Sequence, residues 1–218
     1  LNKVSWQEMP GMPLTACVYQ QYLVVSRENA DMDSNSELID FYAVKFLDGQ
    51  YEMELKTIAS AHFMTLDFLI IHDTYLVASD IQQALIIYKA TNCGNNNNNN
   101  DADENTDQFQ IEKVSQDYSP KQLTYLAYFN NNIFAASLTS TVYAYSIDKN
   151  GMIAEIGAFQ CSSQVLSFAS RENNLFYGTS SGGIGVFSKT EDKGHLALQA
   201  ALYDSKDIKI LADRIPKR

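Results

Sequence analysis

Apolar and polar positions alternate in short runs along most of this sequence, and polar turn residues separate one run from the next. Residues 175–188 show the pattern best, because two stretches rich in aromatic and β-branched residues flank the turn Ser181-Gly182-Gly183. Glycine adopts positive φ without steric cost, and the flanking residue types suit a pleated, half-buried surface. This stretch therefore predicts a β-hairpin.

Looser versions of the same unit occur upstream, and turn pairs such as Asp48-Gly49 and Asn150-Gly151 separate their strands. The predicted strands are residues 14–18, 22–26, 38–46, 51–58, 64–71, 75–79, 83–89, 108–114, 123–129, 133–137, 141–147, 152–159, 165–170, 175–179 and 183–188. In the strand 51–58 the alternation predicts four residues on one face: Tyr51, Met53, Leu55 and Thr57.

The predicted strands fall into four units. Their second strands begin at Tyr22, Tyr75, Ile133 and Leu175, with spacings of 53, 58 and 42 residues. Without the polar loops in the two longer spacings the period is about 40–45 residues, which is typical of a four-stranded propeller blade. Helical periodicity is nearly absent before residue 190, which argues against a parallel βαβ fold. The sequence predicts an all-β fold, part of a β-propeller of about four blades of four-stranded antiparallel sheet, over residues 1–190.

Two segments depart from the blade pattern. Residues 92–107 hold six consecutive asparagines and four acidic residues, a composition that predicts disorder. Residues 191–218 predict a short C-terminal helix and a basic tail, and the apolar stripe of the helix is Leu196, Leu198, Ala200, Ala201, Leu202 and Tyr203. The fourth unit lacks a fourth strand, and open sheet edges favour aggregation. We therefore expect the chain to be the C-terminal part of a larger propeller, with further blades supplied from elsewhere.

Composition argues against some classes of partner and some cellular locations. The apolar fraction of 45% allows a buried core, whereas the net charge of -10 argues against non-specific nucleic-acid binding. No signal peptide is recognisable, and no apolar run approaches the ~20 residues of a membrane helix, so we expect no membrane association. The cysteines Cys17, Cys93 and Cys161 are odd in number and show no paired spacing, which favours a reducing compartment, either the nucleus or the cytoplasm. Cys17 lies in an apolar strand and is expected to pack in the core.

Residues that suggest chemistry have simpler structural explanations. Gly182-Gly183-x-Gly185 leads into a strand rather than a helix, so we interpret it as a hairpin turn and not as a phosphate loop. The histidines show no ligand spacing and are interpreted as surface or packing residues: His62, His72 and His195. An acidic insertion lacks the glycine and terminal glutamate of a calcium loop: Asp101, Asp103, Glu104 and Asp107. We assign no catalytic residue, no metal ligand and no cofactor, and we predict that the chain is not an enzyme.

Aromatic residues are the remaining candidates for binding. The sequence has 13 tyrosines and 11 phenylalanines, and tyrosine is favoured at protein interfaces. Most of them are expected to pack between blades. The sequence does not identify which of the others bind a partner.

Several segments carry a family resemblance. Residues 75–82 read Tyr-Leu-Val-Ala-Ser-Asp-Ile-Gln and lead to Tyr88-Lys89, and residues 117–120 read Asp-Tyr-Ser-Pro. Further along, the segments are Ile-Ala-Glu-Ile-Gly-Ala-Phe at 153–159, Phe-Tyr-Gly-Thr at 176–179, Gly-Gly-Ile-Gly at 182–185 and Leu-Gln-Ala-Ala-Leu at 198–202. Together they resemble the C-terminal propeller of the CPSF-A family. The resemblance covers nearly the whole chain and is most specific at 176–185 with the helix that follows.

Three kinds of CPSF-A protein resemble this chain. Residues 54–57 and 155–159 look like the large damaged-DNA-binding subunit, the adaptor of a cullin–RING ubiquitin ligase. Residues 79–82 and 182–185 look more like the propeller subunit of the branch-site splicing complex, and the large cleavage and polyadenylation subunit is the third member. The family pairs a C-terminal propeller with an N-terminal one, and the cleft between them grips a helical segment of a partner. The resemblance implies a nuclear, non-catalytic scaffold for protein subunits, with nucleic acid reached through the complex.

Two other classes of function have less support in the sequence. A propeller enzyme or small-molecule binder would need polar or metal-binding residues at the starts of several inner strands, where this sequence has mostly apolar or small residues. Direct recognition of nucleic acid has support only from the basic tail at 206–218.

Overall fold

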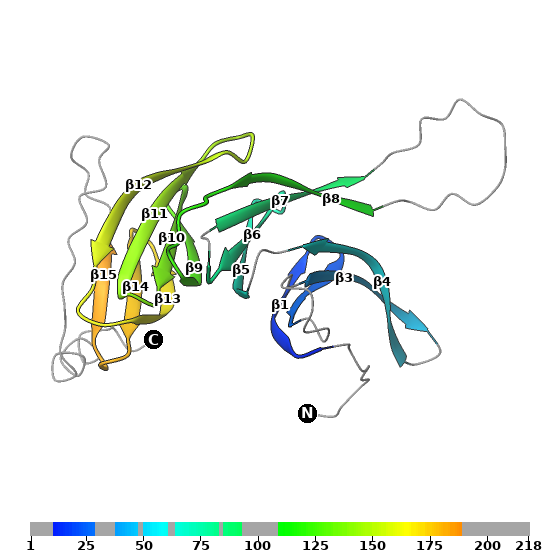
Figure 1. Ribbon diagram of the computed structural model, residues 1–218, viewed down its shortest axis with the longest axis horizontal. Helices are drawn as coiled ribbons and strands as arrows, with labels where there is room; N and C mark the ends of the chain where they lie inside the picture. Colours follow the sequence, from blue (N-terminus) through cyan, green and yellow to red (C-terminus); the bar gives the residue numbers. More distant parts are fainter. Residues whose placement is uncertain are drawn as a thin grey trace. The chain divides into compact units, whose positions relative to one another are not determined.

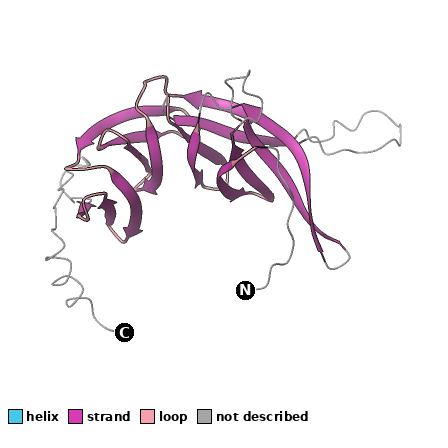
Figure 2. Cartoon of the chain, turned by 60° about the horizontal axis from the view of Figure 1, so that its bottom comes forward, coloured by secondary structure: helices cyan, strands magenta, loops and turns pink. Residues whose placement is uncertain are grey.

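The computed structural model describes residues 11–28, 38–47, 50–60, 64–82, 85–92 and 109–188. In this part of the chain every strand belongs to one of four antiparallel sheets, and within each sheet neighbouring strands follow chain order (Figure 1). Figure 2 shows strands and loops, and no helix, among the described residues. The predicted all-β fold of repeated, blade-like sheets is confirmed. The predicted helix and tail at 191–218 lie outside the described residues. So does the predicted disordered loop 92–107 except for Asn92, which is not in a loop but pairs with Phe109 at the end of a strand.

The chain divides into two compact units, Leu1–Pro120 and Lys121–Arg218, with two sheets in each. The first sheet contains β1 (Pro13–Tyr19), β2 (Tyr22–Arg27), β3 (Leu38–Leu47) and β4 (Gln50–Ser60). The second contains β5 (Thr65–Ile71), β6 (Tyr75–Asp80), β7 (Leu85–Asn92) and β8 (Phe109–Gln116).

In the second unit, the third sheet contains β9 (Leu123–Phe129), β10 (Asn132–Ser137), β11 (Thr141–Ile147) and β12 (Ile153–Gln160). The fourth contains β13 (Val165–Arg171), β14 (Asn174–Thr179) and β15 (Ile184–Ser188). Among the described residues the fourth sheet therefore has three strands, as the sequence predicted.

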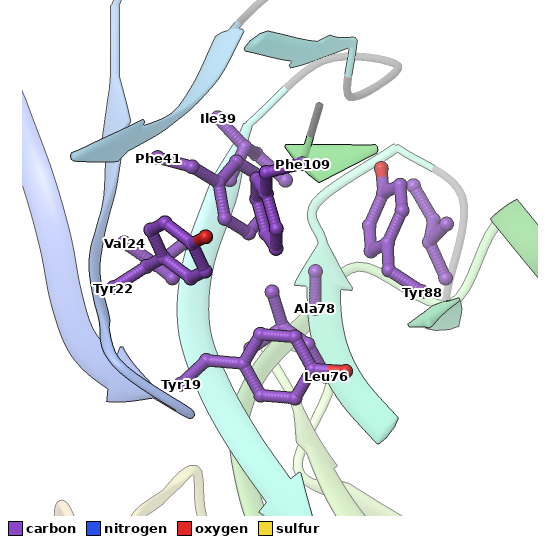
Figure 3. Close-up of a cluster of buried hydrophobic side chains, with 10 residues drawn as sticks. Tyr19, Tyr22, Val24, Ile39, Phe41, Leu76, Ala78, Tyr88 and Phe109 are labelled. Atoms are coloured by element: carbon purple, nitrogen blue, oxygen red, sulfur yellow. The ribbon is translucent and has the colours of Figure 1, made fainter. Parts of the chain in front are cut away.

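The core of the first unit lies between its two sheets (Figure 3). Tyr22 and Val24 on β2 pack with Leu76 and Ala78 on β6, since alternate residues of a strand lie on the same face. The hydroxyl of Tyr19 donates a hydrogen bond to the carbonyl of Thr74 (2.5 Å), which fastens the first sheet to the second. Cys17 packs against this core, as predicted.

The core of the second unit repeats the arrangement. Phe134 on β10 stacks on Phe187 of β15, with ring centroids 5.7 Å apart, and Tyr177 of β14 lies 4.8 Å from Phe187. All three side chains are buried. Aromatic pairs of this kind add to the stabilisation that comes from burial alone.

The starts of two second strands differ from the prediction by one residue. β10 and β14 begin at Asn132 and Asn174, not at Ile133 and Leu175, so the spacings become 53, 57 and 42 residues. Counted from the observed starts, Phe134 is the third residue of β10 as Val24 is of β2, and each belongs to a core between two sheets.

The predicted glycine turn is present between β14 and β15. Gly182 has a φ of +83°, a conformation that glycine adopts without strain. Gly185 on β15 is required for a different reason, because a Cβ there would lie 2.0 Å from Cζ of Tyr177. The glycines of this segment therefore serve the turn and the packing of an aromatic ring.

Candidate interaction surface

The hairpin of β3 and β4 is longer than any other hairpin in the described part of the chain. Its strands have 10 and 11 residues, whereas the other described strands have 5 to 8. Phe46 is paired with Tyr51, and Val44 with Met53. Because directly opposed residues share a face, these side chains form one surface with Leu55, the partner of Tyr42. We call Val44, Phe46, Tyr51, Met53 and Leu55 the hairpin face.

The hairpin face is apolar and open to solvent. The exposed fraction is 61% for Phe46, 49% for Tyr51, 46% for Leu55 and 43% for Val44. The rings of Phe46 and Tyr51 lie against each other, with centroids 4.9 Å apart. None of the five side chains carries a charge. Contiguous exposed apolar surface of this kind marks interaction sites in soluble proteins.

The reverse side of the hairpin is charged. Lys45 on β3 donates a hydrogen bond to the Glu54 carboxylate (Nζ to Oε2, 2.9 Å), and Lys56 donates one to its other oxygen. Hydrogen bonds from Lys56 and Lys45 lower the pKa of Glu54 to about 2. Glu52 is exposed on the same side. The hairpin is therefore amphipathic, with one apolar face and one ionic face.

The base of the hairpin is fixed by a buried ion pair. The Arg27 guanidinium donates to the carboxylate of Asp40 (Nε to Oδ2, 2.6 Å), and the Tyr42 hydroxyl donates to the same oxygen at 3.0 Å. Burial and the hydrogen bond to Asp40 raise the pKa of Tyr42 to about 12. Oδ1 of Asp40 has no hydrogen-bond partner although the residue is fully buried. Removal of either Arg27 or Asp40 would leave the other charge buried and uncompensated.

A β-bulge corrects one sequence prediction. Leu55 pairs with Tyr42, but Thr57 pairs with Phe41, so β4 has an extra residue, Lys56, at this point. Thr57 therefore lies on the opposite face from Tyr51, Met53 and Leu55, contrary to the alternation. Ile58, which pairs with Asp40, takes the position on the apolar side.

Many aromatic side chains of the described residues are buried, several of them in the cores between the sheets of each unit. Buried examples are Tyr19, Tyr22, Phe41, Tyr42, Tyr75, Tyr88, Phe109, Phe129, Phe134, Tyr145, Tyr177 and Phe187. Few aromatic side chains of the described residues are exposed, and two of these, Phe46 and Tyr51, are paired on the hairpin face. The sequence placed Tyr51 on an apolar face but gave no indication that this face is uncovered.

The histidine and cysteine residues of the described ranges do not form a catalytic or metal site. His72 is exposed in the turn between β5 and β6, at a φ of 51°, and Cys161 is buried in the core of the second unit. No group of three or more potential metal ligands occurs among the described residues. Several predicted candidates lie outside those residues: His62, Cys93, Asp101, Asp103, Glu104, Asp107 and His195.

Across the described ranges no helix is long and apolar enough to cross a membrane.

Comparison with known proteins supports the fold. No protein-family model and no curated protein matches this chain. Among solved structures, it is similar to the computationally designed Ika4 protein, with a TM-score of 0.56 and 13% sequence identity. The match covers 86% of this chain and 98% of the designed protein. A likeness at this level of identity concerns the fold alone.

Proposed function

We propose that this chain is part of a non-catalytic scaffold, and that its hairpin face binds a protein partner. The observation that carries the proposal is the uncharged apolar surface of Val44, Phe46, Tyr51, Met53 and Leu55 on a hairpin longer than its counterparts. Paired aromatic side chains bury a large area at low entropic cost when a partner covers them. The buried Arg27–Asp40 pair holds the base of the hairpin, so less conformational freedom is lost on binding.

The class of partner follows from the resemblance to the CPSF-A family. On this proposal the partners are subunits of a nuclear complex, foremost of a cullin–RING ubiquitin ligase whose substrate receptors the scaffold recruits. The alternative partners are subunits of the splicing or the cleavage and polyadenylation machinery. The net charge of -10 supports protein rather than nucleic acid as the direct ligand.

Affinity capture from nuclear extract tests the proposal. The chain is compared with a variant that carries Phe46→Ser and Tyr51→Ser. A matched control carries Tyr118→Ser and Met152→Ser, two apolar residues that are exposed to 70% and 54% elsewhere on the chain. We expect the wild type and the control to capture subunits of one of the three complexes, and the hairpin variant to lose them. Equal capture by all three proteins would overturn the assignment of the site.

A further inference from the structure

The outer edge of β4 is the feature of the hairpin that the proposed function does not use. β4 is the last strand of the first sheet, and no described strand pairs with its outer edge. With 11 residues it is the longest strand of the described chain, whereas the corresponding strands β8 and β12 have 8 residues each. An edge strand presents alternate backbone N–H and C=O groups outward, ready to pair with another extended segment.

The bulge at Lys56 limits the regular part of this edge. Pairing with β3 is regular from Gln50 to Leu55 and shifts immediately afterwards. A bulge bends its strand and interrupts hydrogen bonding, so it ends the length over which a neighbour can pair. The edge available to another strand is therefore Gln50 to Leu55.

The two sides of this edge have different chemistry. On one side lie Tyr51, Met53 and Leu55 of the hairpin face, and on the other lie Glu52 and Glu54. Lys45 is directly opposite Glu52 in the register, but its ammonium group bonds to Glu54. The carboxylate of Glu52 consequently remains exposed at the outer strand, on a chain whose net charge is -10.

We propose that β4 accepts an extended segment of the partner as an additional strand, with apolar residues beside Tyr51 and Met53 and lysine or arginine beside Glu52. This inference rests on the proposed function, which it deepens by naming the mode of binding and the chemistry of the partner. The added strand extends the hairpin face by one row of side chains, because strands of one sheet keep their alternation in step. Main-chain hydrogen bonds supply the affinity, and the alternation of apolar and basic residues supplies the specificity.

The exposed edge of β4 favours an extended partner segment over a helical one. A helix laid on the hairpin face would cover Phe46 and Tyr51 but would leave the backbone of the β4 edge in water and Glu52 without a counter-charge. An added strand satisfies the edge and places a cation beside Glu52 at the same time. A helical partner is thus the alternative outcome that the experiment must separate.

The test uses the full chain and synthetic peptides as probes. One peptide of about seven residues, a length that covers the regular edge, alternates lysine and valine, and a second alternates glutamate and valine. Binding is measured by fluorescence anisotropy, and amide hydrogen exchange reports which backbone groups become protected. We expect the lysine–valine peptide to bind more tightly and to protect alternate amides within Gln50 to Leu55, but none beyond Lys56.

Charge reversal sharpens the test. We expect Glu52→Lys to weaken binding of the lysine–valine peptide on the order of tenfold, as loss of an important interface group does, and to strengthen binding of the glutamate–valine peptide. Glu112→Lys, on the outer strand β8 of the second sheet, makes the same change in net charge and should alter neither affinity appreciably.

Two results would overturn the inference. One is the absence of binding, or equal binding of the two peptides. The other is binding that depends on Phe46 and Tyr51 without protection of the β4 amides, which would indicate docking on the face alone. If the nuclear-extract capture depends on the hairpin face while the peptides leave β4 unprotected, the scaffold proposal stands and strand addition is wrong.

Discussion

Two hairpins occupy the same place in their sheets and differ in what they expose. β3–β4 and β11–β12 are each the third and fourth strands of a four-stranded sheet. The strands of the β11–β12 hairpin have 7 and 8 residues, and its turn is closed by Asp148, which accepts backbone hydrogen bonds from Asn150 and Met152. The strands of β3–β4 have 10 and 11 residues, and they carry the paired rings of Phe46 and Tyr51.

Comparison of the two hairpins shows how much strand length the sheet requires. The β11–β12 hairpin shows that strands of 7 and 8 residues are enough to complete a sheet of this kind. The additional length of β3–β4 does not contribute to the core. Phe46 and Tyr51 are about half exposed or more, whereas Phe41, on the same strand as Phe46, is fully buried. A contiguous exposed apolar surface, unlike single exposed apolar residues, is a mark of an interaction site.

The largest contrast is between an interior and a hairpin phenylalanine. Phe134→Ala should lower the free energy of unfolding by about 3–5 kcal/mol, because it opens a cavity beside Phe187. Phe46→Ala should change it by no more than about 0.5 kcal/mol, as expected of an exposed side chain. Urea denaturation of both variants measures the difference. Similar losses would mean that the hairpin face is part of the folded core.

A smaller contrast concerns the tyrosines at the same position of β3 and β11. Tyr42→Phe removes a hydrogen bond to the fully buried Asp40 and should cost about 1–3 kcal/mol. In the third sheet the Tyr145 hydroxyl accepts a hydrogen bond from Lys121, which also bonds to Glu155. Because Lys121 keeps that second partner, Tyr145→Phe should cost about 0.5–1.5 kcal/mol. Thermal unfolding ranks the two, and the reverse order would contradict the role given to the Asp40 group.

The turn of β11–β12 should depend on a single carboxylate. Asp148→Ala removes the acceptor for the N–H groups of Asn150 and Met152 and should lower the free energy of unfolding by about 1 kcal/mol. Lys149→Ala, in the same exposed turn, is the matched control and should be nearly neutral. Equal effects of the two substitutions in chemical denaturation would show that Asp148 does not close the turn.

The smallest effect is expected in the ionic side of β3–β4. Bonds from Lys56 and Lys45 lower the pKa of Glu54 from 4.5 to about 2, so its contribution to stability is complete above pH 4.5 and is lost as the pH falls towards 2. Because Glu54 is on the surface, salt should weaken this contribution. Titration of the Glu54 carboxyl group by NMR should show a higher pKa in Lys56→Ala and Lys45→Ala. An unchanged pKa in both variants would exclude the ion pairs as its cause.

Local sequence pattern predicted the strands well where residues that favour turns bound them. The bounds of β9 and β11 agree with the prediction, since Asn130-Asn131 and Thr139-Ser140 mark their ends or starts clearly. The predicted starts of β10 and β14 are one residue too late. Asparagine is typical of turns, but Asn132 and Asn174 pair as the first residues of these strands.

The features that define the candidate site were not predictable from local pattern. Alternation on β4 shows that its two faces differ, but it does not show whether another element covers the apolar face. The bulge at Lys56 leaves the alternation of Tyr51, Met53 and Leu55 intact and becomes visible only in the pairing with β3. The Arg27–Asp40 pair joins residues on two strands and depends on their register.

Exchange of hairpin length tests the central claim most directly. In a variant of the full chain, residues 45–52 are replaced by Asn-Gly, a dipeptide suited to a two-residue hairpin turn, so that β3–β4 becomes about as short as β11–β12. The account predicts that this variant keeps the free energy of unfolding to within about 1 kcal/mol, as expected for loss of exposed residues only, and no longer captures nuclear complex subunits. Retention of capture by the shortened chain, or failure of that chain to fold, would contradict the account.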